Sequence, residues 1–167
     1  MGNFKRLCFV ILLFVCSTLC FAKQISFQIV QHDDAAEEVT ESSLTIEDEI
    51  LNTFFDYGFI VTNSEAKISS VNGVDEKLYK IGVGDAFNGY SDYFIQINLF
   101  YNKNEDSISI GSDLTKVNFL VASVQTGEIF ADKTFNNIKL SNQKDDLKKV
   151  SSDLVLEINK VLKSKKA

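Results

Sequence analysis

Residues 46–61, IEDEILNTFFDYGFIV, hold the clearest structural signal in this chain of 167 residues. Apolar side chains recur from Ile46 at the spacing of one helix face. Gly58 follows where the C-terminus of a helix commonly has a glycine. The apolar residues 59–61 come directly after it, so the stretch predicts a helix that leads into a strand.

A strand precedes this stretch. Apolar and polar residues alternate over 25–29, which is the period of a half-buried strand, and an acidic loop, 32–38, follows it. Ser42 or Ser43 can cap the helix, and the acidic residues 47–49 are placed in its first turns, at the positive end of the helix dipole. Two strands joined by a helix predict a parallel pair with a right-handed crossover.

The remaining elements predict a mixed sheet. A second helix is expected near 75–88, where Gly82 and Gly84 indicate close packing or a break after Ile81. Gly127 is free to take a positive φ in a tight turn between two antiparallel strands. The expected later elements are strands at 93–101, 117–121 and 129–135 and a helix at 142–163. The fold class is therefore α/β (α+β), a single mixed sheet in the order β-α-β-α-β-β-β-α with helices packed on it.

The N-terminus has the pattern of an export signal. Lys5 and Arg6 precede an uncharged apolar run, 7–19. That run is too short to cross the ~30 Å hydrocarbon core of a membrane as a stable anchor. Cleavage after Ala22 is expected, so residues 1–22 form a signal peptide.

Residues 23–167 are then one α/β domain that ends in a lysine-rich tail. The expected location is the periplasm or the cell envelope. The alternative is lipid attachment at Cys20, which gives an outer-membrane lipoprotein with weak membrane association. Leu19 before Cys20 fits lipidation poorly, because small residues usually precede the modified cysteine.

Cleavage after Ala22 removes all three cysteines and the only arginine of the chain. The mature chain then has no residue for a disulfide, a thiol nucleophile or a cysteine metal site. Its 15 basic and 23 acidic residues give a net charge of −8. An acidic surface without arginine excludes nucleic acid as an expected partner, because its phosphates require a basic face.

The sequence contains no recognisable catalytic constellation. His32 is the only histidine, and no serine-bearing elbow or distinguishable acid–base pair accompanies it. No enzyme activity and no cofactor are therefore expected. His32, Asp33 and Asp34 offer imidazole and carboxylate ligands in one loop, and a divalent cation is the alternative use for them. A solvated loop is the simpler interpretation.

The aromatic-rich strand 93–101 is the better candidate for a functional surface. Phe94 and Phe100 share one face of this strand with two amide side chains, opposite the face of Ile95 and Leu99. If this face is uncovered, it can dock a partner protein; the alternative is that helices cover both faces of the sheet. The predicted partner-binding residues are Tyr93, Phe94, Gln96, Asn98 and Phe100.

Three segments resemble a group of bacterial envelope domains. Residues 46–61 are similar to the first helix-to-strand passage of that group, 92–95 to the entry into its third strand, and 119–130 to its hairpin with a Thr-Gly-Glu turn. The group includes the penicillin-binding-protein activator LpoB, the periplasmic domain of the curli secretion protein CsgG and the N-terminal domain of TolB. Its usual lipid-attachment cysteine and long tether are missing here.

The resemblance implies a shared fold and a non-catalytic role in the envelope. The first hypothesis is therefore an exported accessory or adaptor protein that acts by contact with an envelope protein of unknown identity. The alternative is a periplasmic protein that binds a small ligand or a divalent cation.

Overall fold

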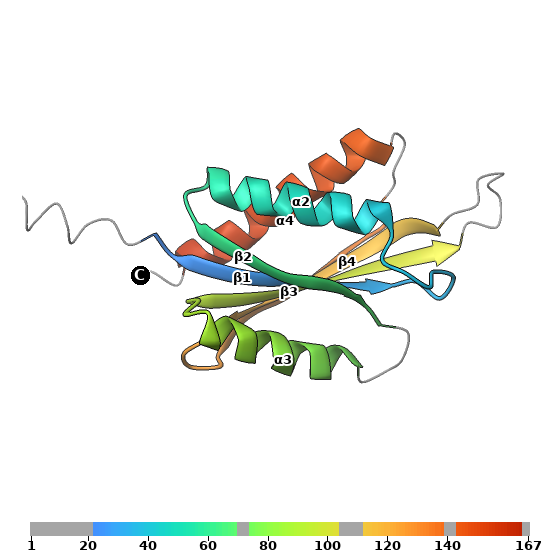
Figure 1. Ribbon diagram of the computed structural model, residues 1–167. Helices are drawn as coiled ribbons and strands as arrows, with labels where there is room; N and C mark the ends of the chain where they lie inside the picture. The colour runs from blue at the N-terminus through green and yellow to red at the C-terminus, as the bar shows by residue number, and fades with distance from the viewer. Residues whose placement is uncertain (1–21, 70–73, 104–111, 139–142, 165–167) are drawn as a thin grey trace, which may run out of the picture.

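The computed structural model describes four segments, residues 22–69, 74–103, 112–138 and 143–164. Figure 1 shows a single sheet with helices on both of its faces. Residues 1–21, which include Cys20 and most of the expected signal peptide, lie outside the described residues. Cleavage after Ala22 and lipidation therefore stay predictions.

The element order is the one expected from the sequence, β-α-β-α-β-β-β-α, and the fold class is confirmed. No helix among the described residues is long and apolar enough to cross a membrane. The elements are β1 (Gln24–His32), α2 (Glu41–Asp56), β2 (Ile60–Ile68), α3 (Val74–Asn88), β3 (Tyr93–Lys103), β4 (Ser112–Ser123), β5 (Ile129–Asn136) and α4 (Gln143–Ser164).

The five strands form one mixed sheet in the order β2-β1-β3-β4-β5. β1 is parallel to both β2 and β3, whereas β3–β4 and β4–β5 are antiparallel. The predicted parallel pair and the predicted hairpin are therefore both confirmed. Gly127 in the hairpin connection has a φ of +70°, the conformation that glycine adopts without strain.

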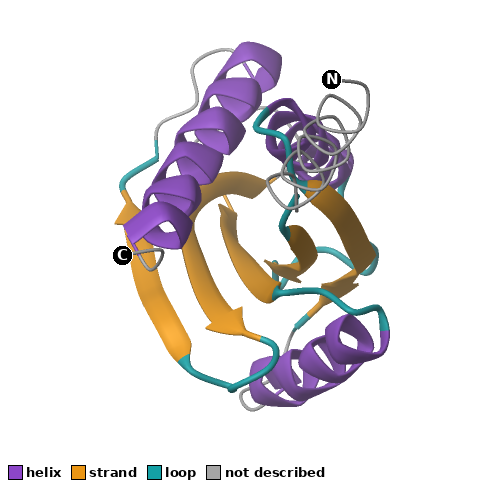
Figure 2. Cartoon of the chain, turned by 90° about the vertical axis from the view of Figure 1, so that its left-hand side faces the viewer, coloured by secondary structure: helices purple, strands orange, loops and turns teal. Residues whose placement is uncertain are grey.

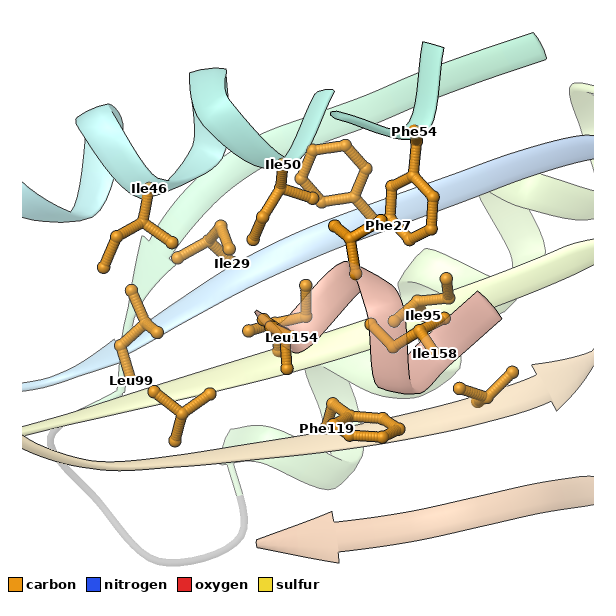
Figure 3. Packing of buried hydrophobic residues seen from close by; sticks show 14 of the residues in the cluster. Phe27, Ile29, Ile46, Ile50, Phe54, Ile95, Leu99, Phe119, Leu154 and Ile158 are labelled. Atoms are coloured by element: carbon orange, nitrogen blue, oxygen red, sulfur yellow. The ribbon is translucent and has the colours of Figure 1, made fainter. Parts of the chain in front are cut away.

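Helices α2 and α4 lie side by side on one face of the sheet (Figures 1 and 2). Large apolar side chains from both helices and from the strands β1, β3 and β4 fill the space between the helices and the sheet (Figure 3). The apolar stripe expected on the last helix is confirmed, because Leu147, Leu154 and Ile158 are buried on this face. We call this side of the sheet the apolar face.

The start of α2 differs from the expectation. Thr40, rather than Ser42 or Ser43, is the N-cap, and its side chain accepts a hydrogen bond from the Ser43 N–H. The Ser43 hydroxyl is engaged elsewhere, with Gln31 Oε1 at 2.7 Å and Tyr101 Oη at 2.9 Å. Burial among these groups raises the pKa of Tyr101 above its usual value.

The acidic residues 47–49 therefore lie in the second turn and beyond, past the reach of the helix dipole. Glu47 is buried and accepts a hydrogen bond of 2.8 Å from Asn63 Nδ2 of β2. Glu47 thus joins α2 to the edge strand that follows it. At the other end, Gly58 takes a φ of +82° and ends the helix as predicted.

Candidate functional site

Helix α3 lies against β1 and β3 on the second face of the sheet (Figure 1), the face for which partner binding was predicted. Phe94 is fully buried there and packs with Ala86, Val124 and Tyr79 in a small apolar cluster. A Cβ atom added at Gly82 would collide with the ring of Phe94. Gly82 is therefore required for close packing, one of the two roles expected for it, and α3 runs through it without a break.

A polar layer separates the N-terminal half of α3 from the sheet. It consists of Gln28 and His32 of β1, Gln96 and Asn98 of β3, and Asp75 of α3. Gln28, Gln96 and Asn98 are buried. At Gln96 and Asn98 the face is therefore covered, as in the alternative interpretation of the sequence, and is not an open docking surface. The Gln96 side chain donates a hydrogen bond of 3.2 Å to the Asp75 carbonyl and ties the strand to α3.

Several buried atoms of this polar layer have no hydrogen-bond partner within the described part of the chain. They are Gln28 Oε1, His32 Nε2, Asp75 Oδ1 and Asn98 Oδ1. The His32 Nε2 atom lies 3.2 Å from Asp75 Oδ2, which is an ion-pair distance without hydrogen-bond geometry. Because unpaired buried polar groups cost free energy, this half of α3 gains little stability from the layer.

Phe100 lies at the far end of the same face and is only partly buried. The His32 ring stacks on it at a centroid distance of 4.3 Å, and Lys116 Nζ of β4 lies 3.5 Å from its ring centroid. The imidazole and the ammonium group thus both rest on one aromatic ring. This stack extends the face towards β4 and β5, where α3 does not lie against the strands.

Tyr93 lies on the other side of the strand from Phe94. Its ring contacts Phe130 edge to face, and its hydroxyl accepts a hydrogen bond from Lys23 Nζ. The five residues predicted to bind a partner are therefore divided between both faces of the sheet. The described structure does not bring them together on one accessible surface.

The residues of the cation alternative are also divided. His32 faces Asp75, whereas Asp33 is buried and its Oδ1 accepts a hydrogen bond of 3.0 Å from the Ala35 N–H. Asp34 is exposed. No group of three His, Cys, Asp or Glu side chains within the described residues could hold a metal ion. The geometry therefore gives the cation alternative no support.

An exposed aromatic surface lies at the C-terminal end of α3. The Phe87 side chain is 62 % exposed and that of Tyr90 is 88 % exposed. They border a hollow of about 230 Å³, which Ser91, Val124 and Gln125 also line. We call this the Phe87–Tyr90 surface. Tyr90 lies just before the aromatic-rich strand 93–101 noted in the sequence, and neither Tyr90 nor Phe87 is among the residues predicted to bind a partner.

The backbone at Tyr90 is strained. Tyr90 has a φ of +59°, in the left-handed region that bulky residues rarely adopt. The Ser91 N–H donates to the Ala86 carbonyl and the Tyr90 N–H to the Phe87 carbonyl, so Tyr90 holds the position after the helix where glycine is usual. Gly89 is its direct neighbour, yet the tyrosine takes the strained position.

The end of α2 has the same hydrogen bonds but a different residue. The Phe59 N–H donates to the Phe54 carbonyl and the Gly58 N–H to the Phe55 carbonyl, with glycine in the left-handed position. For a residue with a side chain this conformation costs about 1–2 kcal/mol. The fold alone therefore favours glycine at both helix ends, and the tyrosine at the second one calls for another explanation.

Comparison with known proteins assigns a family. The chain belongs to a family described as "Uncharacterised protein", whose model matches residues 24–163. No curated protein matches the chain. A solved structure of similar fold is the PelC dodecamer from Paraburkholderia phytofirmans, with 13 % identity and a TM-score of 0.50 over 81 % of this chain and 87 % of that one.

Two further solved structures belong to the group that the sequence resembles. TolB from Acinetobacter baumannii is 12 % identical, with a TM-score of 0.43 over 81 % of this chain and 28 % of that one. The C-terminal domain of LpoB from Salmonella enterica is 15 % identical, with a TM-score of 0.38 over 70 % of this chain and 84 % of that one. Members of the group named from the sequence are thus among the solved structures found, and neither a partner nor an activity follows from these matches.

Proposed function

We propose that this protein is an exported, non-catalytic accessory domain of the cell envelope that contacts a partner protein through the Phe87–Tyr90 surface. The observation that carries the proposal is Tyr90, which keeps a left-handed backbone and an almost fully exposed ring. A strained residue whose side chain packs against nothing stabilising has no role in the fold itself. Exposed aromatic residues are frequent anchors of protein interfaces.

The surroundings of Tyr90 support the proposal. Phe87 supplies a second exposed ring that lines the same hollow as Tyr90. A hollow of this kind gives an aromatic interface anchor a place to pack. Tyr93 and the buried Phe94 follow directly in β3, so the proposed contact lies at the accessible end of the strand predicted from the sequence to bind a partner.

The envelope location rests on the export signal and on the group of envelope domains that the fold resembles. The absence of a catalytic role rests on the sequence, which offers one histidine and no thiol after cleavage. Intact mass of the exported protein tests the export step. A mature chain that begins at Lys23 supports cleavage after Ala22. A mature chain that begins at a lipid-modified Cys20 supports the lipoprotein alternative instead.

Tyr90→Gly is the decisive variant. Relief of the left-handed strain should leave the free energy of unfolding unchanged or raise it by up to about 1 kcal/mol. The same variant should fail to complement a deletion strain, because the anchor is lost. Phe55→Ser is the matched control, since Phe55 is 72 % exposed and belongs to α2, which lies on the other face of the sheet from α3.

In-cell photo-crosslinking from residue 88 identifies the partner, and Tyr90→Gly should abolish the crosslink. Full complementation by Tyr90→Gly together with loss of function in Phe55→Ser would place the contact on α2 and contradict the proposal. An enzymatic activity that Tyr90→Gly abolishes would contradict the proposal that the protein is non-catalytic.

A further inference from the structure

A groove of about 300 Å³ lies between the end of β5 and the N-terminal half of α4, on the apolar face. Val117 and Leu154 are buried at its base, and Phe135, Ile138 and Val150 are its partly buried apolar walls. These side chains belong to the main core, so the groove opens directly onto it. The groove is a separate site from the Phe87–Tyr90 surface, and the two share no lining residue.

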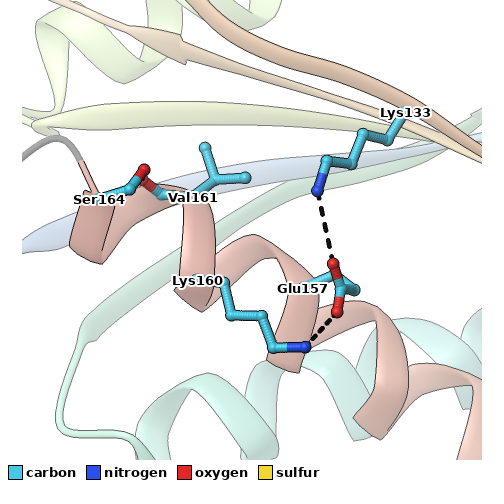
Figure 4. Close-up of polar contacts among 5 residues, drawn as sticks. All are labelled: Lys133, Glu157, Lys160, Val161 and Ser164. Atoms are coloured by element: carbon cyan, nitrogen blue, oxygen red, sulfur yellow. Dashed lines mark hydrogen bonds and ion pairs between the residues drawn. The ribbon is translucent and has the colours of Figure 1, made fainter.

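The groove begins where the contact between β5 and α4 ends. Lys133 of β5 pairs with Phe119 in register, so its side chain lies on the apolar face. There its Nζ atom lies 3.4 Å from Glu157 of α4, and Glu157 also pairs with Lys160 (Figure 4). Beyond this ion pair the N-terminal end of α4 rises away from the sheet, which leaves Phe135 partly uncovered (Figure 1).

β5 is also an edge strand, and its outer side has no strand neighbour among the described residues. The Ser123 N–H donates to Glu128, so the odd-numbered residues of β4 turn their backbone groups towards β5. In the register of this pair, Val117 and Phe119 lie opposite Phe135 and Lys133. Thr134, which lies between them, therefore turns its N–H and C=O outwards, next to the groove.

The rim of the groove is polar and bears a net negative charge. Asp146 and Asp153 of α4 contribute two carboxylates, and Lys149 between them contributes one ammonium group. A segment that enters the groove therefore passes carboxylates on its way to an apolar floor. The surface selects a large apolar side chain flanked by basic residues.

We propose that the β5 edge and this groove bind an extended segment of a partner protein. The segment adds a strand to β5 through the outward backbone groups at Thr134. One large apolar side chain of the segment enters the groove against Phe135 and Val150, and a basic neighbour faces Asp153. Strand addition supplies affinity through main-chain hydrogen bonds, and the pocket beside the edge supplies specificity.

Synthetic peptides test the proposal on the full mature domain. The probe is acetyl-Thr-Lys-Thr-Leu-Thr-Lys-Thr-amide, and its binding is measured by isothermal titration calorimetry and by chemical-shift mapping. Saturable binding below about 1 mM is expected, with shifts confined to β5 and the N-terminal half of α4. Replacement of the central leucine by serine, or of both lysines by glutamate, should weaken binding by about tenfold or more.

Thr134→Pro removes the outward N–H and should weaken binding of the probe by about tenfold, since a proline at this edge cannot donate. Thr134→Val is the matched control, because it keeps the N–H and loses only the hydroxyl, which accepts a hydrogen bond from Asn118. Val150→Lys is the second test, since it places a charge in the groove wall should Thr134→Pro fail to fold. Tyr90→Gly should leave binding unchanged, which separates this site from the Phe87–Tyr90 surface.

Three results overturn the proposal: no binding of any probe at about 1 mM, equal binding by Thr134→Pro and Thr134→Val, or equal binding of the lysine and glutamate probes. Two others assign the groove to a different occupant. Concentration-dependent dimerisation that Thr134→Pro abolishes assigns it to a second copy of the chain. Probe binding that appears only in Leu140→Ser assigns it to the chain's own segment 139–142.

Discussion

The two faces of this sheet bury side chains of different chemistry. The apolar face packs α2 and α4 over a large cluster from Ile25 to Leu162. Its buried polar group at the start of α2 is satisfied, since Gln31, Ser43 and Tyr101 bond to one another. Beneath α3, by contrast, one small apolar cluster lies beside a polar layer with four unpaired buried atoms within the described residues, whereas α4 has one, Asn159 Oδ1. We infer that packing on the apolar face holds the fold together and that α3, on the other face, is the most weakly held helix of the domain.

The largest expected effect lies on the apolar face. Leu154→Ala removes a buried side chain of α4 and should lower the free energy of unfolding by about 2–5 kcal/mol. Leu156→Ala on the exposed side of the same helix is the control and should change it by less than about 0.5 kcal/mol. Urea denaturation measures both. A loss below about 0.5 kcal/mol for Leu154→Ala would mean that α4 is not docked on the sheet.

Two glycines of α3 give the next contrast. Gly82→Ala introduces a Cβ atom into the ring of Phe94 and should destabilise the protein by about 1–3 kcal/mol. A Cβ atom added at Gly84 meets nothing within 4 Å, so Gly84→Ala should stabilise α3 by about 0.5–1 kcal/mol through helix propensity. Thermal melting followed by circular dichroism distinguishes them. Equal effects of the two substitutions would show that α3 does not pack on Phe94.

The smallest expected effect concerns the ion pairs of Glu157. The hydrogen bond from Lys160, with Lys133 nearby, lowers the pKa of Glu157 below its usual value. A lowered carboxyl pKa adds stability above the usual pKa, and this contribution is lost as the pH falls through the folded value. Glu157→Gln should therefore slightly reduce the loss of stability between neutral and acid pH, and salt should diminish the difference.

Melting temperatures at neutral and acid pH, in low and high salt, measure this effect. Glu38→Gln is the control, since Glu38 is exposed and has no ion pair among the described residues. If Glu157→Gln loses as much stability between neutral and acid pH as the unaltered protein, the ion pair across the α4–β5 contact contributes nothing to stability.

Much of the fold could be predicted because its signals are local. The helix-to-strand passage at 46–61, the turn at Gly127 and the stripe of the last helix each follow from periodicity or turn chemistry within one stretch. The cap at Thr40 was missed because Ser43, an equally good capping residue, bonds to Gln31 and Tyr101, which are distant from it in sequence.

The site was harder to predict, for two physical reasons. Strand alternation correctly placed Phe94, Gln96 and Asn98 on one face, but whether a helix covers that face depends on a long-range fit of Gly82 against Phe94. The exposed ring of Tyr90 depends on a left-handed backbone, and the adjacent Gly89 is the residue that sequence rules assign to such a position.

Native-state hydrogen exchange tests the difference between the two faces most directly. The most protected amides of α2 and α4 should exchange only through global unfolding, with a free energy that falls linearly with denaturant. Those of α3 should exchange through a local opening of clearly lower free energy that is insensitive to low denaturant. If the α3 amides are as protected as those of α4 and follow the same denaturant dependence, the claim that α3 is weakly held is contradicted.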